Sequence, residues 1–168
     1  MTTQPLRTAI RGVHVMNGTD DLGVRTAVLN DGRIEGYDLD GPFDVEVDGS
    51  GLVLTNAFID PHVHLREPGF EVKEDLTSGL RAAAAGGFGT VVSMANTDPV
   101  IDNPEQVRGL LEKAADIPGA RLQPAASLTF GLKGERLTDA AALQEAGAVL
   151  LTDDGIPVAD SDVMRRAC

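Results

Sequence analysis

The sequence is poor in cysteine and in basic residues, and both shortages limit what the protein can be. The one cysteine, Cys168, excludes an internal disulfide and is compatible with a reducing cytosol. The sequence has only 14 Lys and Arg residues but 26 Asp and Glu residues. The resulting formal net charge of −12 at pH 7 argues against nucleic-acid and anionic-membrane partners. No segment has the pattern of a signal peptide or a membrane-spanning helix. The composition therefore predicts a cytoplasmic protein with no nucleic-acid or membrane partner.

Residues 1 to about 56 have the pattern of short β-strands. Ala27-Val28-Leu29 and Arg33-Ile34-Glu35 flank Asn30-Asp31-Gly32, which is a turn signal for a β-hairpin. Val45 and Val47 alternate with acidic residues in a further extended segment. This part therefore predicts a small β module, with too few strands to close a barrel.

From residue 57 onward, predicted strands alternate with predicted helices. The strands begin near residues 58, 89, 122 and 149, a spacing of about thirty residues that is typical of βα units. The first helix is expected over about 72–85, and Thr138 and Gly147 are expected to begin and end the third. The acidic residues from Glu67 to Asp75 are expected on a solvated face or beside the first helix's N-terminus.

Two architectures fit this order of elements. The chain is either a complete small open α/β protein or the first half of a (β/α)₈ barrel. At about 31 residues per unit, the sequence after residue 56 amounts to about three and a half barrel units. The last predicted helix opens near Ser161 and has no C-terminal cap before Cys168, which favours the half-barrel and a truncated chain.

The most informative segment runs from Phe58 to Gly69 and contains a His-x-His-x-Arg motif. Alternate side chains of a strand point to the same face, so His62, His64 and Arg66 are expected to share one wall. Imidazoles suit zinc and similar ions, and an arginine beside such an ion implies an anion between them. The motif precedes a strand-ending Glu-Pro-Gly, and the C-terminal ends of strands are where α/β enzymes carry their chemistry. A His-x-His pair alone is weak evidence, and the arginine strengthens the prediction of a metal site for an anionic substrate.

Two later strand ends carry polar residues that can be interpreted in two ways. Asn96 follows the second strand, where its amide can donate to a substrate carboxylate, but turn chemistry alone explains Asn-Thr-Asp-Pro better. Asp153 and Asp154 end the fourth strand, and only one of two adjacent side chains can face the centre of a barrel. A carboxylate there suits a metal ion, while Asp-Asp-Gly suits a turn equally well.

Taken together, these residues resemble class I dihydroorotases of the bacterial type, in the cyclic amidohydrolase superfamily. The resemblance is carried by the segments 58–69, 94–97 and 152–155. It implies the first half of an α/β amidohydrolase (β/α)₈ TIM barrel, preceded by a small β-sandwich module. Residues 1–56 would be the N-terminal part of the sandwich, and residues 57–168 the first four βα units of the barrel. The implied reaction is the reversible cyclisation of N-carbamoyl-L-aspartate to L-dihydroorotate in pyrimidine (UMP) biosynthesis.

The resemblance also assigns roles to the polar residues of the motifs. His62 and His64 would bind the first of two Zn²⁺ ions, and Asp154 would be the carboxylate that both ions share. Family spacing favours Asp154 over Asp153 for this role. The metal site expected from the resemblance is therefore His62, His64 and Asp154.

The resemblance implies that residues of this chain bind the substrate, whereas the residue that transfers the proton lies beyond residue 168. Arg66 and Asn96 would hold the substrate's α-carboxylate, and the backbone around His64 would line the same pocket. The family takes two more histidines and a general acid–base aspartate from later strands, whereas the only other histidine here is His14. We therefore expect the aspartate beyond residue 168, and the 168-residue chain to be an incomplete fragment that is inactive alone.

Three alternatives stay open. Hydantoinases and allantoinases usually place a carboxylated lysine at the end of the fourth strand, and the nearest lysine here is Lys133, which argues against them. A non-catalytic dihydroorotase-like scaffold for aspartate transcarbamoylase is the second alternative, although His62 and His64 are retained. An inert gene fragment is the third. The expected partners are a small-molecule substrate and either a second copy of the chain or aspartate transcarbamoylase.

Overall fold

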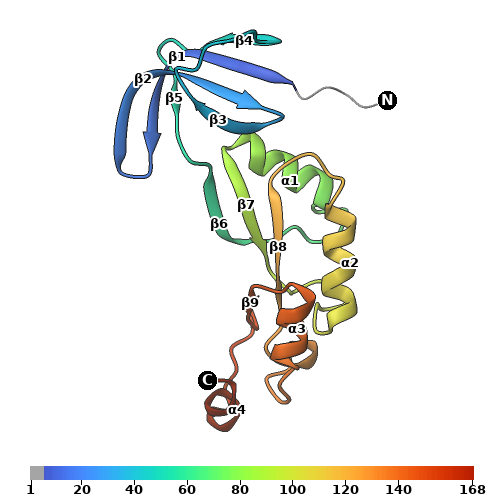
Figure 1. Ribbon diagram of the computed structural model, residues 1–168. Helices are drawn as coiled ribbons and strands as arrows, with labels where there is room; N and C mark the ends of the chain where they lie inside the picture. The colour runs from blue at the N-terminus through green and yellow to red at the C-terminus, as the bar shows by residue number, and fades with distance from the viewer. Residues whose placement is uncertain (1–5) are drawn as a thin grey trace. The chain divides into compact units, whose positions relative to one another are not determined.

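The computed structural model describes residues 6–168, and the chain divides into two compact units, Met1–Asn56 and Ala57–Cys168 (Figure 1). The first unit is all β and the second is α/β. No helix among the described residues is long and apolar enough to cross a bilayer.

The first unit contains one five-stranded sheet. Its strands are β1 (Arg7–Asn17), β2 (Asp20–Asn30), β3 (Arg33–Tyr37), β4 (Val45–Asp48) and β5 (Val53–Leu54). The order is β3-β2-β1-β4, β5 also pairs with β1, and both β4 and β5 run parallel to β1. Val13 and Val15 of β1 and Ala27 of β2 form the small buried core of this unit.

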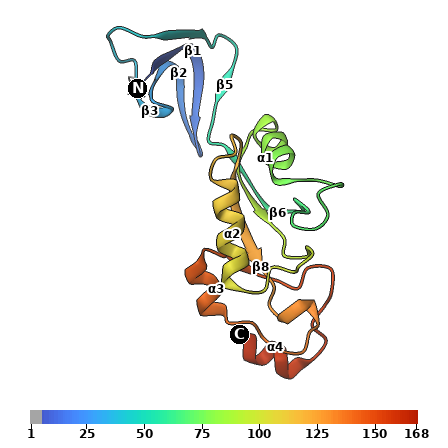
Figure 2. The same cartoon turned by 90° about the vertical axis from the view of Figure 1, so that its right-hand side faces the viewer.

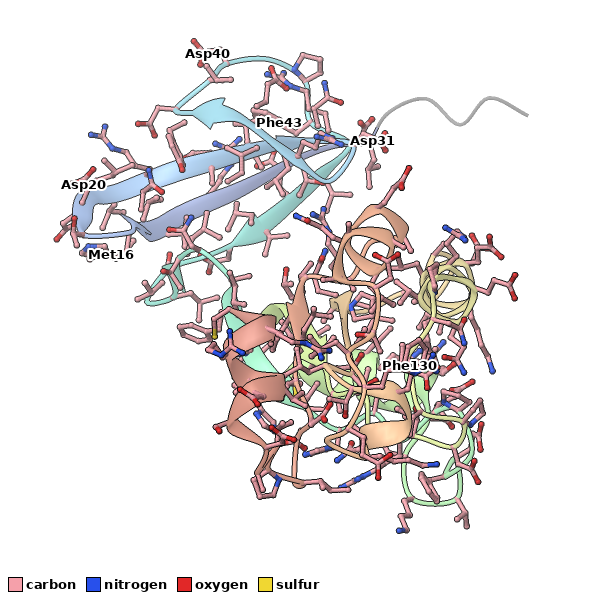
Figure 3. All side chains as sticks on the ribbon, turned by 90° about the horizontal axis from the view of Figure 1, so that it is seen from below. Met16, Asp20, Asp31, Asp40, Phe43 and Phe130 are labelled. Carbon is pink, nitrogen blue, oxygen red and sulfur yellow. The ribbon has the colours of Figure 1, made fainter. Side chains whose placement is uncertain are left out.

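The hairpin predicted from Asn30-Asp31-Gly32 is confirmed. Asn30 of β2 pairs with Arg33 of β3, and Asp31 and Gly32 between them have φ angles of 50° and 73°. A two-residue turn with both φ angles positive matches the twist of the flanking strands. Asp20, the first residue of β2, and Asp31, in the turn after it, are labelled in Figure 3.

The second unit is a parallel sheet with helices in its crossovers (Figures 1 and 2). Its strands, in the order β6-β7-β8-β9, are β6 (Phe58–Val63), β7 (Phe88–Ser93), β8 (Arg121–Ala126) and β9 (Leu150–Leu151). Its helices are α1 (Leu76–Ala85), α2 (Pro104–Ala114), the short 3₁₀ helix η1 (Phe130–Leu132), α3 (Ala140–Ala146) and α4 (Ser161–Ala167). Sequential parallel strands with intervening helices are the arrangement of a barrel wall.

The core of the second unit lies between the sheet and its helices. Leu76 and Leu80 of α1 and Val107 of α2 are fully buried, and they belong to one cluster with Val91 of β7 and Leu122 of β8. Two large apolar side chains of β6, Phe58 and Ile59, are instead 58% and 66% exposed. Within the described residues, β6 and β9 each pair with a single strand of the sheet.

Helix α1 begins at Leu76, so the expected start at residue 72 is wrong. Asp75 is its N-cap and accepts from the Ser78 amide at 2.8 Å, and the Ser78 side chain accepts from the Asp75 amide in return. This reciprocal pair is a capping box, which fixes the first turn. Glu71 accepts instead from the amide of Gly69 at 2.9 Å, in the turn before the helix.

Helix α3 begins one residue later than expected. Asp139, not Thr138, is the N-cap, and its carboxylate accepts from the Ala142 amide at 3.0 Å. The Thr138 hydroxyl is buried and donates to the carbonyl of Ser127 at 2.8 Å, which ties the loop to the end of β8. Gly147 ends the helix with a φ of 111°, as predicted, because this left-handed conformation favours glycine.

Candidate metal centre

The two histidines of the motif lie side by side at the C-terminal end of β6. The pairing of β6 with β7 shifts between Asp60 and Val63, which indicates a bulge at the end of the strand. The ring centroids of His62 and His64 are 5.3 Å apart, and the rings are inclined by 66°. The Asp60 carboxylate accepts from the His62 amide at 3.0 Å, which fixes the backbone at this point.

Asp154 joins the histidines from the other edge of the sheet. Its Oδ1 lies 3.2 Å from His62 Nε2, and its Oδ2 lies 3.5 Å from His64 Nε2. One possible ligand atom from each of the three residues lies within 4.8 Å of the others. Because β6 and β9 are the outer strands of the sheet, this contact requires the sheet to curve, as in the wall of a barrel.

Asp153 points elsewhere and has a structural role. Its carboxylate accepts from the backbone amide of Thr129 at 2.9 Å and from the Thr129 hydroxyl. Thr129 is fully buried, and its hydroxyl oxygen accepts from the Gly134 amide at 2.8 Å. Asp153 therefore ties the loop after β8 to the end of β9, and the structure brings Asp154 rather than Asp153 to the histidines.

Asn96, which follows β7, bridges the other strand ends. Its Oδ1 lies 3.0 Å from His64 Nδ1, and its Nδ2 donates to Asp154 Oδ2 at 3.0 Å. The hydrogen bonds of the neighbouring turn come from Thr97 instead, whose hydroxyl donates to the carbonyl of Pro99 at 2.8 Å. Turn chemistry therefore does not account for the Asn96 side chain.

Arg66 lies beyond the strand, so strand alternation, from which its place beside the histidines was predicted, does not extend to it. Strand β6 ends at Val63, and Arg66 has a φ of 61°, in the left-handed region. The residue is half-buried. Among residues 6–168, the hydrogen bonds and ion pairs of His62, His64 and Asp154 do not include its guanidinium.

Glu67 is buried rather than solvated, and sequence reasoning missed its role. Its Oε2 accepts from the Leu76 amide at the start of α1 at 2.8 Å, and its Oε1 pairs with Lys113 of α2. The hydrogen bond and charge of Glu67 raise the pKa of Lys113 above its usual value. No local signal reveals the pair, because 46 positions separate its members.

The residues of the cluster fit a zinc ion. Two imidazole nitrogens and a carboxylate are donors that zinc takes, and ligand atoms on a tetrahedral zinc lie about 3.3 Å apart for bonds of about 2.0–2.1 Å. The contacts of His62 and His64 with Asp154, at 3.2 and 3.5 Å, are close to this separation. His64 and Asp154 are partly shielded, with 29% and 19% of their side chains exposed.

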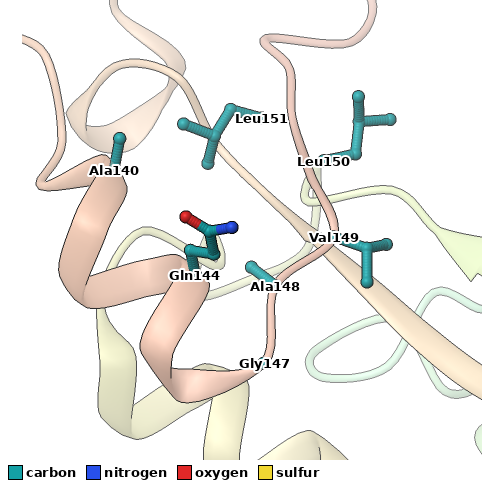
Figure 4. Close-up of a pocket in the computed structure, with 7 residues that line it drawn as sticks. All are labelled: Ala140, Gln144, Gly147, Ala148, Val149, Leu150 and Leu151. Atoms are coloured by element: carbon teal, nitrogen blue, oxygen red, sulfur yellow. The ribbon is translucent and has the colours of Figure 1, made fainter.

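A separate open hollow of about 540 Å³ lies between α3 and β9 (Figure 4). Its lining residues are Ala140, Gln144, Gly147, Ala148, Val149, Leu150 and Leu151. None of these side chains titrates or is a usual metal ligand. The candidate metal ligands of the second unit are therefore His62, His64 and Asp154, and none of them lines this hollow.

Comparisons with known proteins identify the family of the chain. Residues 51–168 match the family model described as dihydro-orotase-like. Dihydroorotase from Deinococcus radiodurans is 54% identical over 82% of this chain and 33% of its own length. Dihydroorotase from Thermus aquaticus is 50% identical over 92% of this chain and 36% of its own length. The chain thus spans about a third of the length of these curated relatives.

Solved structures establish the fold. The L-hydantoinase (dihydropyrimidinase) from Arthrobacter aurescens matches 86% of this chain and 32% of its own with a TM-score of 0.70 and 17% identity. A crystal structure of a dihydroorotase matches 87% of this chain and 42% of its own with a TM-score of 0.57 and 15% identity. The predicted fold class, a small β-sandwich module followed by the first half of an α/β barrel, is confirmed by these matches. By sequence, the chain belongs to the dihydro-orotase-like family.

Proposed function

We propose that this chain supplies part of the active site of a zinc-dependent dihydroorotase. The enzyme would interconvert N-carbamoyl-L-aspartate and L-dihydroorotate. The observation that carries the proposal is the convergence of His62, His64 and Asp154 at the C-terminal ends of β6 and β9. Relatives that bear the name dihydroorotase, at 54% and 50% identity, support it.

His62, His64 and Asp154 are the proposed zinc ligands, and Asp154 is proposed to be shared by two ions. Zinc at this position would lower the pKa of a coordinated water and polarise the amide carbonyl of the substrate. The protein's own contribution is to hold the three donors at two strand ends, those of β6 and β9, before the metal arrives. Such preorganisation means that little rearrangement is needed when charge develops on the substrate.

Arg66 is the proposed anchor of the substrate's α-carboxylate. A guanidinium presents a planar pair of donors that matches the two carboxylate oxygens, and a half-buried position strengthens the pairing. The backbone around His64 is proposed to line the same pocket. Asn96, the second proposed carboxylate donor, is already engaged at both ends of its amide. The Nδ2 group carries two hydrogens, so the one that is not donated to Asp154 is left for the substrate carboxylate.

The remaining groups for turnover are proposed to lie outside these 168 residues. Apart from His62 and His64 the chain has one histidine, His14, which pairs with Asp21 in the first unit. The further zinc ligands and the aspartate that moves the proton to and from the ring nitrogen would come from elsewhere in the protein. Residues 57–168 would then be the first four βα units of the barrel, and residues 1–56 part of the β-sandwich.

The test is a substrate assay of the longest natural polypeptide that contains this sequence, reconstituted with zinc. We expect hydrolysis of L-dihydroorotate and cyclisation of N-carbamoyl-L-aspartate, both abolished by Asp154→Asn. The matched control is Asp116→Asn, because Asp116 is an exposed carboxylate in the turn after α2 and should leave both rates unchanged. Turnover of hydantoin or allantoin without turnover of dihydroorotate would contradict the proposal.

A further inference from the structure

Asn96 occupies an unusual position between two of the three candidate zinc ligands. It lies at the end of β7, while His64 and Asp154 lie at the ends of β6 and β9. Its amide touches both of them at 3.0 Å, across 32 and 58 positions of sequence. A single short side chain therefore links three strand ends.

The direction of these two hydrogen bonds follows from their chemistry. An ionised carboxylate only accepts hydrogen bonds, so the amide group of Asn96 that faces Asp154 must be the Nδ2 donor. The Oδ1 of Asn96 then faces His64 and only accepts, so the hydrogen in that contact must belong to His64 Nδ1. A neutral imidazole with its hydrogen on Nδ1 presents Nε2 as a free lone pair.

The free lone pair is directed at the proposed metal position. In that tautomer, His64 Nε2, which lies 3.5 Å from Asp154 Oδ2, has no hydrogen to donate to the carboxylate, and two acceptors face each other. A cation held between the two atoms turns this unfavourable contact into a favourable one. The amide of Asn96 thus selects the tautomer that can bind a metal, and it restrains the carboxylate on the opposite side.

We propose that Asn96 is a positioning residue of the metal centre, which holds His64 as its Nδ1–H tautomer and orients Asp154. This inference rests on the proposed function and adds a role to Asn96 that differs from binding the substrate carboxylate. Asparagine suits the position because its amide both donates and accepts within one short side chain. Aspartate cannot donate to Asp154, and leucine can do neither.

The test measures zinc affinity and the His64 tautomer in the same polypeptide. Zinc is titrated against a chromophoric chelator, and long-range ¹H–¹⁵N spectra of the metal-free, histidine-labelled protein report which ring nitrogen carries the hydrogen. A His64→Gln variant assigns the signals. In the wild-type protein we expect the hydrogen on Nδ1 of His64. In Asn96→Leu we expect the hydrogen to shift toward Nε2 and zinc affinity to fall by about 10- to 100-fold.

Two further variants keep the test decisive. Asn96→Ala removes both hydrogen bonds without adding bulk and should also lose zinc affinity, which covers the case in which Asn96→Leu does not fold. Arg66→Lys should keep both the tautomer and the zinc affinity. If the wild-type protein binds zinc but Asn96→Ala and Asn96→Leu bind it equally well with an unchanged tautomer, the positioning role is overturned. If the wild-type protein fails to bind zinc, the proposed function itself is overturned.

Discussion

His62 Nε2 lies 3.2 Å from Asp154 Oδ1, although the two residues belong to opposite edges of a four-stranded sheet. The sheet must curve to bring these edges together, and β7 and β8 form the wall between them. The curvature of the sheet therefore brings the candidate zinc ligands together. A flat sheet of four strands spaced about 4.8 Å apart would keep the two side chains well out of reach.

The two adjacent aspartates should separate metal binding from stability. Asp154→Asn is expected to lose zinc while its unfolding transition stays near that of the wild type, because within residues 6–168 the side-chain hydrogen bonds and ion pairs of Asp154 join it to the two histidines and Asn96. Asp153→Asn should retain zinc but lose about 1–3 kcal/mol of unfolding free energy, since the buried Thr129 depends on its carboxylate. Metal analysis and urea unfolding of both variants check this, and zinc loss in Asp153→Asn alone would reverse the assignment.

Arg66→Lys should impair substrate use and leave the metal in place. The ammonium group of lysine supplies one point charge where the guanidinium supplies two aligned donors. Losing such a charge-assisted pair costs about 1.5–3 kcal/mol, or roughly ten- to hundredfold in kcat/KM. Steady-state kinetics with L-dihydroorotate, together with zinc content, provide the measurement. Wild-type kinetics in this variant would remove Arg66 as the carboxylate anchor.

Glu67 and Lys113 should contribute unequally to stability. Glu67→Ala leaves the Leu76 amide without its acceptor in a buried position, and we expect a loss of about 1–3 kcal/mol of unfolding free energy. The Lys113 side chain is 62% exposed, so solvent screening should limit the cost of Lys113→Met to less than about 1 kcal/mol. Urea unfolding of the two variants compares these costs. Equal midpoints for Glu67→Ala and the wild type would show that the carboxylate does not hold the start of α1.

The N-cap of α1 should make stability depend on pH in acid. Hydrogen bonds from the amide and side chain of Ser78 hold the pKa of Asp75 below its usual value. A carboxyl group with a lowered folded pKa stabilises the protein above its unfolded pKa of about 3.9, and this contribution is lost as the pH falls through the folded value. Asp75→Asn keeps a capping oxygen but cannot ionise.

Unfolding of wild type and Asp75→Asn at several pH values tests this dependence. The variant should be less stable than the wild type near pH 7, and the difference should shrink as the pH falls through the folded pKa of Asp75. A difference that stays constant across this range would show that the charge of Asp75 does not act through the cap.

Much of the fold is predictable because its signals are local. The turn at Asp31-Gly32 follows from its residue types, and the parallel strand order follows from the regular spacing of βα units. The proximity of His62 and His64 is likewise encoded within three positions of one strand end. In each case, the residues that allow the prediction lie within the turn, the βα unit or the strand end that they predict.

The parts of the site that residue patterns alone left open depend on contacts between distant segments. Which of Asp153 and Asp154 lies beside the histidines depends on Thr129. The amide of Thr129, in the loop after β8, donates to the Asp153 carboxylate and holds it away from the cluster. At Arg66 the backbone is left-handed, with a φ of 61°, so strand alternation does not extend to this residue. The contact of Asn96 with Asp154 joins two strand ends, and turn propensity gives no sign of it.

The most direct test of the central claim is the zinc content of the longest natural polypeptide that contains this sequence. It would be compared with a His62→Ala/His64→Ala variant and with the control Asp116→Asn after identical zinc loading and dialysis. We expect the wild type and Asp116→Asn to retain zinc, and the double variant to lose the ion bound by His62, His64 and Asp154. Equal zinc stoichiometry in the double variant and the wild type would contradict the assignment of this cluster as the metal centre.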